Sequence, residues 1–251
     1  MLADVRRAHD VRAYWDTGGG ISAILPDRYE VFVYRNGDLL CGPFAFDQLL
    51  SGPYHKSCLL DFPVPSTPDT YELIVEMEDY GRLRAVQQMP RCVPLDTLIV
   101  QSLESDSISS FFSGVIEIRF TDPVGEANFY EITVKDSCKS LVPGDVGVVS
   151  LDHKGLVGAS TRVILSDDDW DGQQVSLLLG FEERLGSNYS GCDLWLEFIS
   201  ITEDRYRYMK TLTLAYESYN NPFAEPVLIH YNIENGLGLF SAECPFIYEL
   251  Y

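Results

Sequence analysis

Basic residues are scarce in this sequence, and their scarcity argues against one class of partner. The 251 residues include 18 Lys and Arg but 38 Asp and Glu, which gives a formal net charge of −20 at pH 7. A chain this acidic repels phosphate backbones and anionic lipid surfaces. We therefore expect no nucleic-acid partner. The charge favours solubility in an outer compartment, and attraction for cations or basic peptides is the alternative.

Long apolar runs and catalytic motifs are lacking as well. No stretch is long and apolar enough to span a bilayer as a helix. Neither the H-E-x-x-H motif of zinc proteases nor the G-x-S-x-G nucleophile elbow occurs. We therefore predict that the protein is not an enzyme and uses no cofactor, apart from one candidate calcium loop. A hydrolase whose site assembles from distant residues around His153 or His230 is the remaining catalytic alternative.

Closely spaced cysteines are also absent. The chain has six cysteines and no C-x-x-C motif, so the sequence signatures of zinc ribbons and thioredoxin-like sites are missing. Six cysteines permit three disulfides in fifteen pairings, and Cys41 and Cys58 could face each other across neighbouring strands. We expect instead that most of the cysteines are small, buried apolar residues.

Runs of β-branched and aromatic residues predict strands along most of the chain. Residues Tyr29–Tyr34 read Y-E-V-F-V-Y, and the Asn36-Gly37 pair that follows is a strong hairpin signal. Short strands separated by turn residues are typical of an immunoglobulin-like sandwich. The other strands are predicted at residues 38–41, 58–62, 70–77, 83–88, 96–100, 114–121, 128–135, 161–165, 174–181, 194–200, 226–231 and 246–250.

One segment has the period of a helix. Apolar residues recur at helical spacing from Tyr206 to Tyr216, Asp204 is a candidate N-cap, and Pro222 cannot continue a helix. We predict one α-helix near residues 204–218. The predicted fold class is therefore all-β with this one helix.

The predicted elements suggest two domains. Residues 1–94 would form an immunoglobulin-like β-sandwich, incomplete at its start, that closes between Pro90 and Pro94. Residues 95–251 would form a C-terminal β-sandwich or barrel-like domain that carries the helix.

The segment that most suggests a binding site is acidic. Asp167, Asp169, Asp171 and Gly172 match the opening D-x-D-x-D-G of a calcium loop, whose glycine allows a sharp turn. The twelfth position should be a bidentate Glu but is Leu178. The candidate metal ligands are Asp167, Asp169 and Asp171, and the alternative is an acidic β-turn, because Asp and Gly favour turns for their own reasons.

Aromatic residues are abundant, with 15 Tyr, 13 Phe and 3 Trp. Most should lie in the core of a β-protein, while exposed aromatics make binding platforms. We expect some exposed aromatics around Tyr216, Tyr219 and Phe223.

Three C-terminal segments resemble one family. Residues 206–212 (Y-R-Y-M-K-T-L), 221–226 (N-P-F-A-E-P) and 232–240 (N-I-E-N-G-L-G-L-F) are similar to the Y-x-Y-x-K-S-L, N-P-F-x-x-P and S-N-I-x-G-G-L-G-x-F motifs of the Bacteroidetes domain-of-unknown-function family 4249. The chain departs from the last motif at Tyr231 and Asn235. Residues 125–130 and 166–172 also resemble that family, the latter its S-D-x-x-F-x-G turn, which weakens the calcium interpretation. The resemblance covers about residues 25–251.

The resemblance implies a location and a role. Family members look like predicted outer-membrane lipoproteins at the cell surface, often beside TonB-dependent receptors. The expected function is a non-catalytic binding lipoprotein, accessory to such a receptor in nutrient uptake, with an unknown ligand. The alternative is an adhesion or scaffold module with no small ligand. Residues 1–21 show no signal peptide or lipid-attachment cysteine, so we expect a truncated or misassigned start, and membrane attachment only through a lipid anchor.

Overall fold

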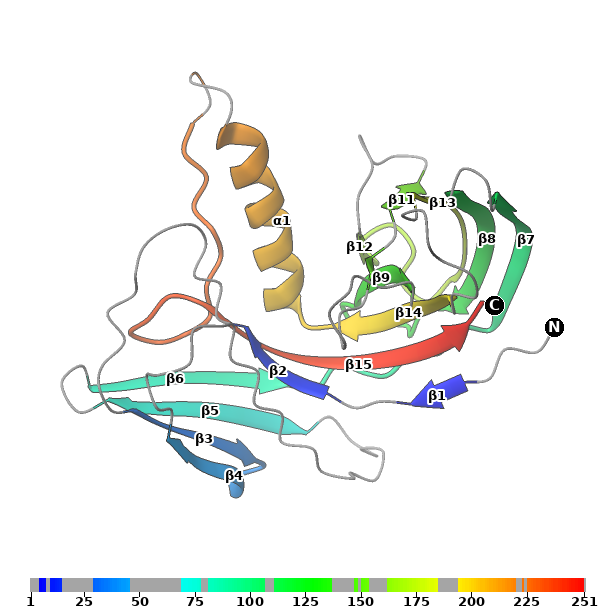
Figure 1. Cartoon of the computed structure of the whole chain (residues 1–251). Helices are drawn as coiled ribbons and strands as arrows, with labels where there is room; N and C mark the ends of the chain where they lie inside the picture. Colours follow the sequence, from blue (N-terminus) through cyan, green and yellow to red (C-terminus); the bar gives the residue numbers. More distant parts are fainter. Residues whose placement is uncertain are drawn as a thin grey trace. The chain divides into compact units, whose positions relative to one another are not determined.

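In a computed structural model, the described residues form three antiparallel sheets and one helix (Figure 1). The all-β prediction with one α-helix is confirmed, and in the described part of the chain the sheets are sandwich-like and none closes into a barrel. The residues that the structure describes are 5–7, 10–14, 29–45, 69–77, 81–106, 111–136, 147–148, 150–153, 162–184, 194–219, 223 and 225–250.

A four-stranded sheet begins with the predicted hairpin. Asn36 and Gly37 have φ angles of 52° and 89°, as a tight hairpin turn requires. Asp69 fixes this turn, because its carboxylate accepts hydrogen bonds from Arg35 Nη2 at 2.6 Å and from Asn36 Nδ2 at 2.8 Å. The sheet order is β4 (Asp38–Ala45), β3 (Tyr29–Arg35), β5 (Thr70–Met77) and β6 (Gly81–Gln88).

A second four-stranded sheet confirms the alternation predicted for residues 114–121. Ile116, Ile118 and Phe120 are fully buried, whereas Arg119 is exposed. One face of this strand therefore lies in the core. The sheet order is β11 (Ser150–His153), β13 (Gln174–Arg184), β8 (Phe111–Thr121) and β7 (Thr97–Asp106).

The third sheet is organised around the last strand. β15 (Leu239–Glu249) starts seven residues earlier than predicted, and residues 239–246 are all buried. A strand that is buried on both faces does not alternate, so its start carries no period-2 signal. The strand order of this sheet is β1 (Val5–Arg7), β15, β14 (Leu194–Ile201), β9 (Phe129–Asp136) and β10 (Gly147–Val148). In addition, β12 (Val163–Ser166) pairs with β9, and β2 (Asp10–Tyr14) pairs with β15.

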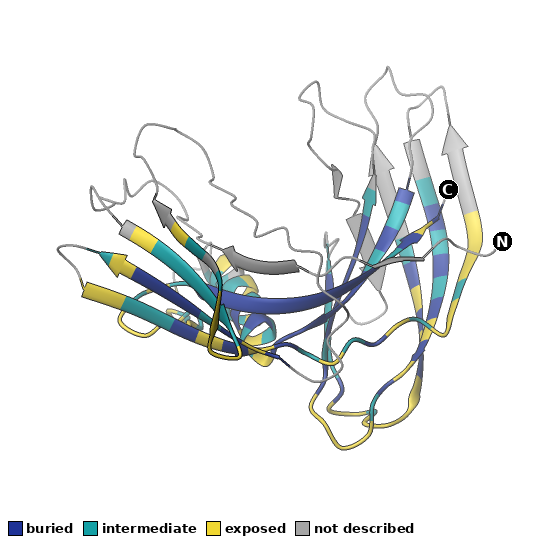
Figure 2. Ribbon diagram, turned by 90° about the horizontal axis from the view of Figure 1, so that it is seen from below, coloured by how far each residue is buried: buried dark blue, intermediate teal, exposed yellow. Residues whose placement is uncertain are grey.

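The chain packs as two compact units that are not consecutive segments. The first unit comprises Met1–Ala8, Arg91–Ser200 and Cys244–Tyr251, and the second comprises His9–Pro90 and Ile201–Glu243. Each has its own buried core, and the buried residues follow the strands (Figure 2). The division into domains 1–94 and 95–251 stays a prediction. The two units contain other segments than the two predicted domains. For example, Ile233 and Phe240 pack in the core of the second unit with residues of β5 and β6.

A disulfide closes the first unit. Cys92 and Cys244 are bonded; their Cα atoms lie 5.4 Å apart, and the two residues are 152 positions apart in the sequence. These two cysteines are exceptions to the expectation that most of the six are simply small, buried apolar residues. The pairing of Cys41 with Cys58 lies outside the side chains that the structure describes.

The helix is confirmed, but its N-cap is not the predicted one. α1 (Glu203–Tyr219) begins after Thr202, whose Oγ1 accepts the backbone N–H of Arg205 at 3.4 Å. Thr202 is therefore the N-cap, and Asp204 lies inside the first turn. α1 is the one helix of the described residues, and it is not long and apolar enough to cross a membrane.

The segment after the helix differs from the prediction. Residues 226–231 form no strand; the backbone N–H of His230 bonds Thr211 Oγ1 of α1 at 2.9 Å. An extended apolar run packed on a helix has the same sequence pattern as a strand, which explains the error. The turn at residues 235–238 is confirmed, with Asn235 at φ 61°. The strand predicted at residues 58–62 lies outside the described residues.

Candidate functional site

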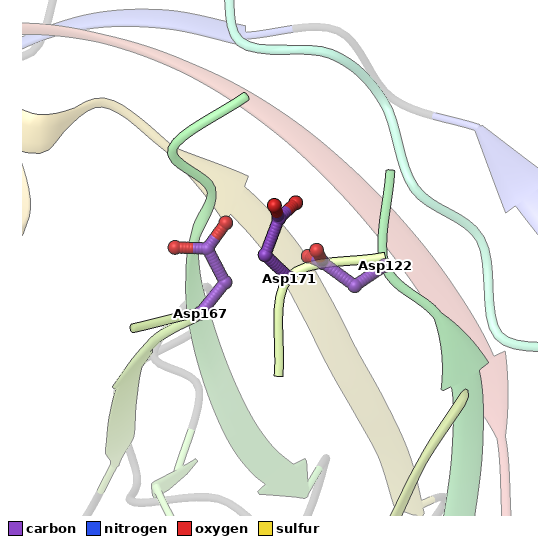
Figure 3. Close-up of side chains that lie close together, drawn as sticks. All are labelled: Asp122, Asp167 and Asp171. Carbon is purple, nitrogen blue, oxygen red and sulfur yellow. The ribbon is translucent and has the colours of Figure 1, made fainter. Parts of the chain in front are cut away.

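Three carboxylates converge in the first unit. One oxygen from each of Asp122, Asp167 and Asp171 lies within 4.8 Å of the others. Asp122 follows β8, Asp167 follows β12 and Asp171 precedes β13; Figure 3 shows Asp171 between the other two. Strand pairing of β8 with β13 and of β12 with β9 brings these turns together.

The cluster overlaps the predicted calcium ligands only in part. Asp167 and Asp171 belong to it, whereas Asp169 is exposed and does not. Asp122 was missed because it lies 45 positions before Asp167 in the sequence. The sequence feature that could have pointed to Asp122 is the Asp122-Pro123 turn at the end of a predicted strand. Such a turn does not by itself indicate a metal ligand.

Backbone N–H groups already donate hydrogen bonds to these carboxylates. Asp171 Oδ1 accepts from Gly125 N at 2.7 Å, and Asp167 Oδ2 accepts from Asn128 N at 2.8 Å. The two carboxylates therefore tie residues 167–173 to the turn after β8. This arrangement is the acidic turn that the sequence offered as the alternative, and calcium binding stays a prediction.

Two further details fit a structural role for this cluster. Asp122 Oδ1 accepts from the hydroxyl of Tyr130 at 2.5 Å, and burial, followed by this bond, raises the pKa of Tyr130. Gly172 has φ 70°, and a Cβ there would lie 2.9 Å from Cβ of Val124. Only glycine fits this position without strain.

A second polar cluster surrounds Asp204 in the second unit. Asp204 Oδ1 lies 2.6 Å from His230 Nε2, and Oδ2 accepts from Asn232 Nδ2 at 3.2 Å and from Gln87 Nε2. Burial acts to raise the pKa of Asp204, but the hydrogen bonds from His230, Gln87 and Asn232 hold it below its usual value. Asp204 thus joins α1, β6 and the segment after the helix.

The Asp204–His230 pair resembles half of a catalytic triad in chemistry. Among the described residues, the ring of His230 bonds Asp204 and no hydroxyl or thiol. The hydroxyl of Thr211 does bond His230, but it accepts the backbone N–H and does not bond the ring. The same hydroxyl donates to the carbonyl of Arg207. We call this bond, which joins α1 to the segment after the helix, the clamp. The side chain of His153, the other candidate base, lies outside the description.

A third feature is a group of exposed apolar side chains in the second unit. Leu214 and Tyr216 lie on the last turns of α1, and their exposed fractions are 45% and 66%. Phe223 and Leu228 follow the helix, at 94% and 88%. Leu214 and Tyr216 are two positions apart and so point to different sides of the helix. We call these four exposed residues near the end of α1 the helix-tip surface. The prediction of exposed aromatics is confirmed for Tyr216 and Phe223, while the side chain of Tyr219 lies outside the description.

Comparison with known protein families gives a match. The family described as "Domain of unknown function (DUF4249)" matches residues 30–243, which is most of the chain. No curated protein matches it.

Proposed function

Because the chain belongs to the DUF4249 family, we propose that it is a non-catalytic, surface-exposed binding lipoprotein of a Bacteroidetes outer membrane. In this role it assists a TonB-dependent receptor in nutrient uptake. The observation that carries the binding role is the helix-tip surface. Large apolar side chains held in water are costly, and clustered ones mark interaction sites.

The disulfide supports the proposed compartment. Structural disulfides form and persist outside the reducing cytoplasm, as in the periplasm and at cell surfaces. Cys244 is fully buried in the core of the first unit, so its bond to Cys92 belongs to the folded structure. A net charge of −20 adds solubility in such a compartment.

Rigid sheets support a binding role. Binding residues are commonly presented by loops and short elements on a rigid scaffold. Here Asp204 of α1 accepts a hydrogen bond from Gln87 of β6, and Ile233 of the segment after the helix packs in the core with residues of β5, β6 and β15. This arrangement presents the helix-tip surface from a fixed base.

Co-purification from the native outer membrane tests the proposal. The full-length protein is tagged, its fractionation is followed, and the proteins that copurify are identified. Recovery of a TonB-dependent receptor is the expected result. Absence from the outer-membrane fraction, or recovery of the protein alone, would contradict it. Recovery of a surface polymer without a receptor would favour an adhesion or scaffold module.

A further inference from the structure

We propose that Asn235 is a site of spontaneous covalent modification, at which its side chain cyclises onto the backbone of Gly236 and is converted to aspartate and isoaspartate. The chain contains two Asn-Gly pairs, Asn36-Gly37 and Asn235-Gly236. Such pairs favour this reaction, because glycine has no side chain to hinder the approach to its backbone nitrogen. The structure distinguishes the two pairs, since it holds Asn36 far more firmly than Asn235. The inference does not depend on the proposed function.

The reaction needs no reagent other than water. The backbone nitrogen of Gly236 attacks Cγ of Asn235 and loses its proton to the solvent. The new N–C bond closes a succinimide ring, the bond between Cγ and Nδ2 breaks, and the amide nitrogen leaves as ammonia. Water then opens the ring at either carbonyl, which gives aspartate or isoaspartate. Because the attacking nitrogen must lose a proton, the rate rises with pH.

Both reacting groups at Asn235 are weakly held. Asn235 lies in a turn and is exposed. Its Nδ2 lies 3.5 Å from the carbonyl oxygen of Arg82, and the attacking group, the N–H of Gly236, donates to the carbonyl of Ile233 at 3.3 Å. Both distances are longer than those of most N–H···O hydrogen bonds, which are about 2.7–3.2 Å. Little interaction energy is therefore lost when the two groups move together.

Asn36, by contrast, is held at both ends of its side-chain amide. Nδ2 donates to Asp69 Oδ1 at 2.8 Å, and Oδ1 accepts the backbone N–H of Thr70 at 2.9 Å. The side chain must give up both hydrogen bonds before Cγ can reach the nitrogen of Gly37. We therefore expect Asn36 to react about tenfold or more slowly than Asn235 in the folded protein.

The fold favours the reactive pair at residues 235 and 236. Asn235 has a φ of 61°, a conformation that Asn adopts more readily than most other residues. A Cβ at Gly236 would lie 3.1 Å from Cδ2 of Leu83 and 3.3 Å from Cγ2 of Ile233, so both side chains would have to move. Backbone conformation and packing therefore both disfavour the substitutions that would remove the reaction.

The product changes the charge and the length of the turn. Aspartate or isoaspartate in place of Asn235 adds a negative charge next to Glu234. The N–H of Glu234 donates to the carbonyl of Arg84 in β6 at 2.8 Å, and the N–H of Asn232 donates to the carbonyl of Gly238 at 3.3 Å. Isoaspartate adds a methylene group to the backbone between Glu234 and Gly238. The modification therefore alters the turn that attaches this segment to β6.

Peptide mapping of the folded full chain tests the inference. The purified protein is incubated in mildly alkaline buffer and digested, and conversion at each Asn-Gly pair is measured by mass spectrometry. Isoaspartate is labelled with an isoaspartyl methyltransferase. We expect conversion at Asn235, and conversion about tenfold or more slowly at Asn36.

The same protein unfolded in urea is the control. Both pairs should convert at similar rates there, because neither side chain is held. Equal rates at the two pairs in the folded protein would overturn the inference. So would an Asn235 that converts in urea but stays intact in the folded protein.

Three variants test the cause of the difference. Asn235→Gln should remove most of the isoaspartate label from the folded chain, because glutamine cyclises more slowly, whereas Asn36→Gln should leave the label unchanged. Asp69→Ala removes the acceptor of Asn36 Nδ2 and should speed conversion at Asn36 without changing the rate at Asn235. A folded Asp69→Ala chain in which Asn36 reacts as slowly as in wild type would overturn the protective role of these hydrogen bonds.

Discussion

Asp204 and His230 are 26 positions apart in the sequence, yet Oδ1 of the first lies 2.6 Å from Nε2 of the second. The pair joins the first turn of α1 to the segment that follows the helix. Gln87 of β6 donates to the other carboxylate oxygen. One side chain therefore holds three elements of the second unit, and it is the most informative place to begin mutagenesis.

Replacing Asp204 should destabilise the fold. Asp204→Asn puts an amide where three donors meet a carboxylate, and loss of charge-assisted hydrogen bonds costs about 1–3 kcal/mol in the free energy of unfolding. Urea denaturation measures it. Glu203→Gln is the matched control, because Glu203 lies one residue away and pairs with Arg207 at the surface. That change should cost no more than about 0.5 kcal/mol. Equal midpoints for the two variants would contradict the clamp.

Stability should fall in acid. Burial acts to raise the pKa of Asp69, but hydrogen bonds from Asn36 and Arg35 hold it below its usual value, and the pKa of Asp204 is lowered similarly. The folded state then binds fewer protons than the unfolded state. This contribution is complete above the unfolded pKa of about 3.9 and is lost as the pH falls through the folded values.

Urea midpoints between about pH 7 and about pH 3 test this dependence. Asp69→Asn and Asp204→Asn should each make the decline below about pH 4 shallower. An unchanged decline in both variants would show that other groups control acid stability.

Loss of the disulfide should be costly. Cys92→Ala with Cys244→Ala removes a crosslink between residues 152 positions apart. The expected cost is about 2–5 kcal/mol, and it appears as a lower melting temperature in calorimetry. Thiol titration of the unfolded wild type should show both cysteines unreactive without a reductant. A double variant with the melting temperature of the wild type would mean that the crosslink does not contribute to stability.

Replacing the aspartates of the acidic turn should lower the free energy of unfolding by unequal amounts. Asp167→Ala leaves the buried N–H of Asn128 without its acceptor, so it should cost about 1–3 kcal/mol. Asp169→Ala changes an exposed side chain and should stay within about 0.5 kcal/mol.

Thermal melts with excess calcium chloride test the metal prediction at the same place. A rise in melting temperature that Asp171→Asn removes would support a calcium site. No rise in the wild type would leave the carboxylates with the structural role alone.

Sequence patterns predicted the parts of the fold whose signal is local. Burial alternates through Ile116, Ile118 and Phe120 as the period-2 pattern indicates, and Asn36-Gly37 adopts the backbone that a hairpin needs. The prediction of a strand at residues 226–231 was wrong, because its apolar pattern does not say whether a helix or a strand is the neighbour.

Long-range partners were beyond local patterns. Asp122 joins Asp167 and Asp171 through strand pairing, and Cys92 meets Cys244 across most of the chain. Neither contact leaves a motif in the sequence. The Asp204–His230 pair was missed for the same reason, and His230 was singled out only as one of two histidines around which a hydrolase site could assemble.

β15 also sets the order of events in synthesis. Its residues Phe240 and Ala242 complete the core of the second unit, while Cys244 and Phe246 complete that of the first. Neither core can therefore complete its packing before β15 has been synthesised. We therefore expect a nascent chain that has not reached β15 to carry two incomplete cores and to fold only once that strand is added.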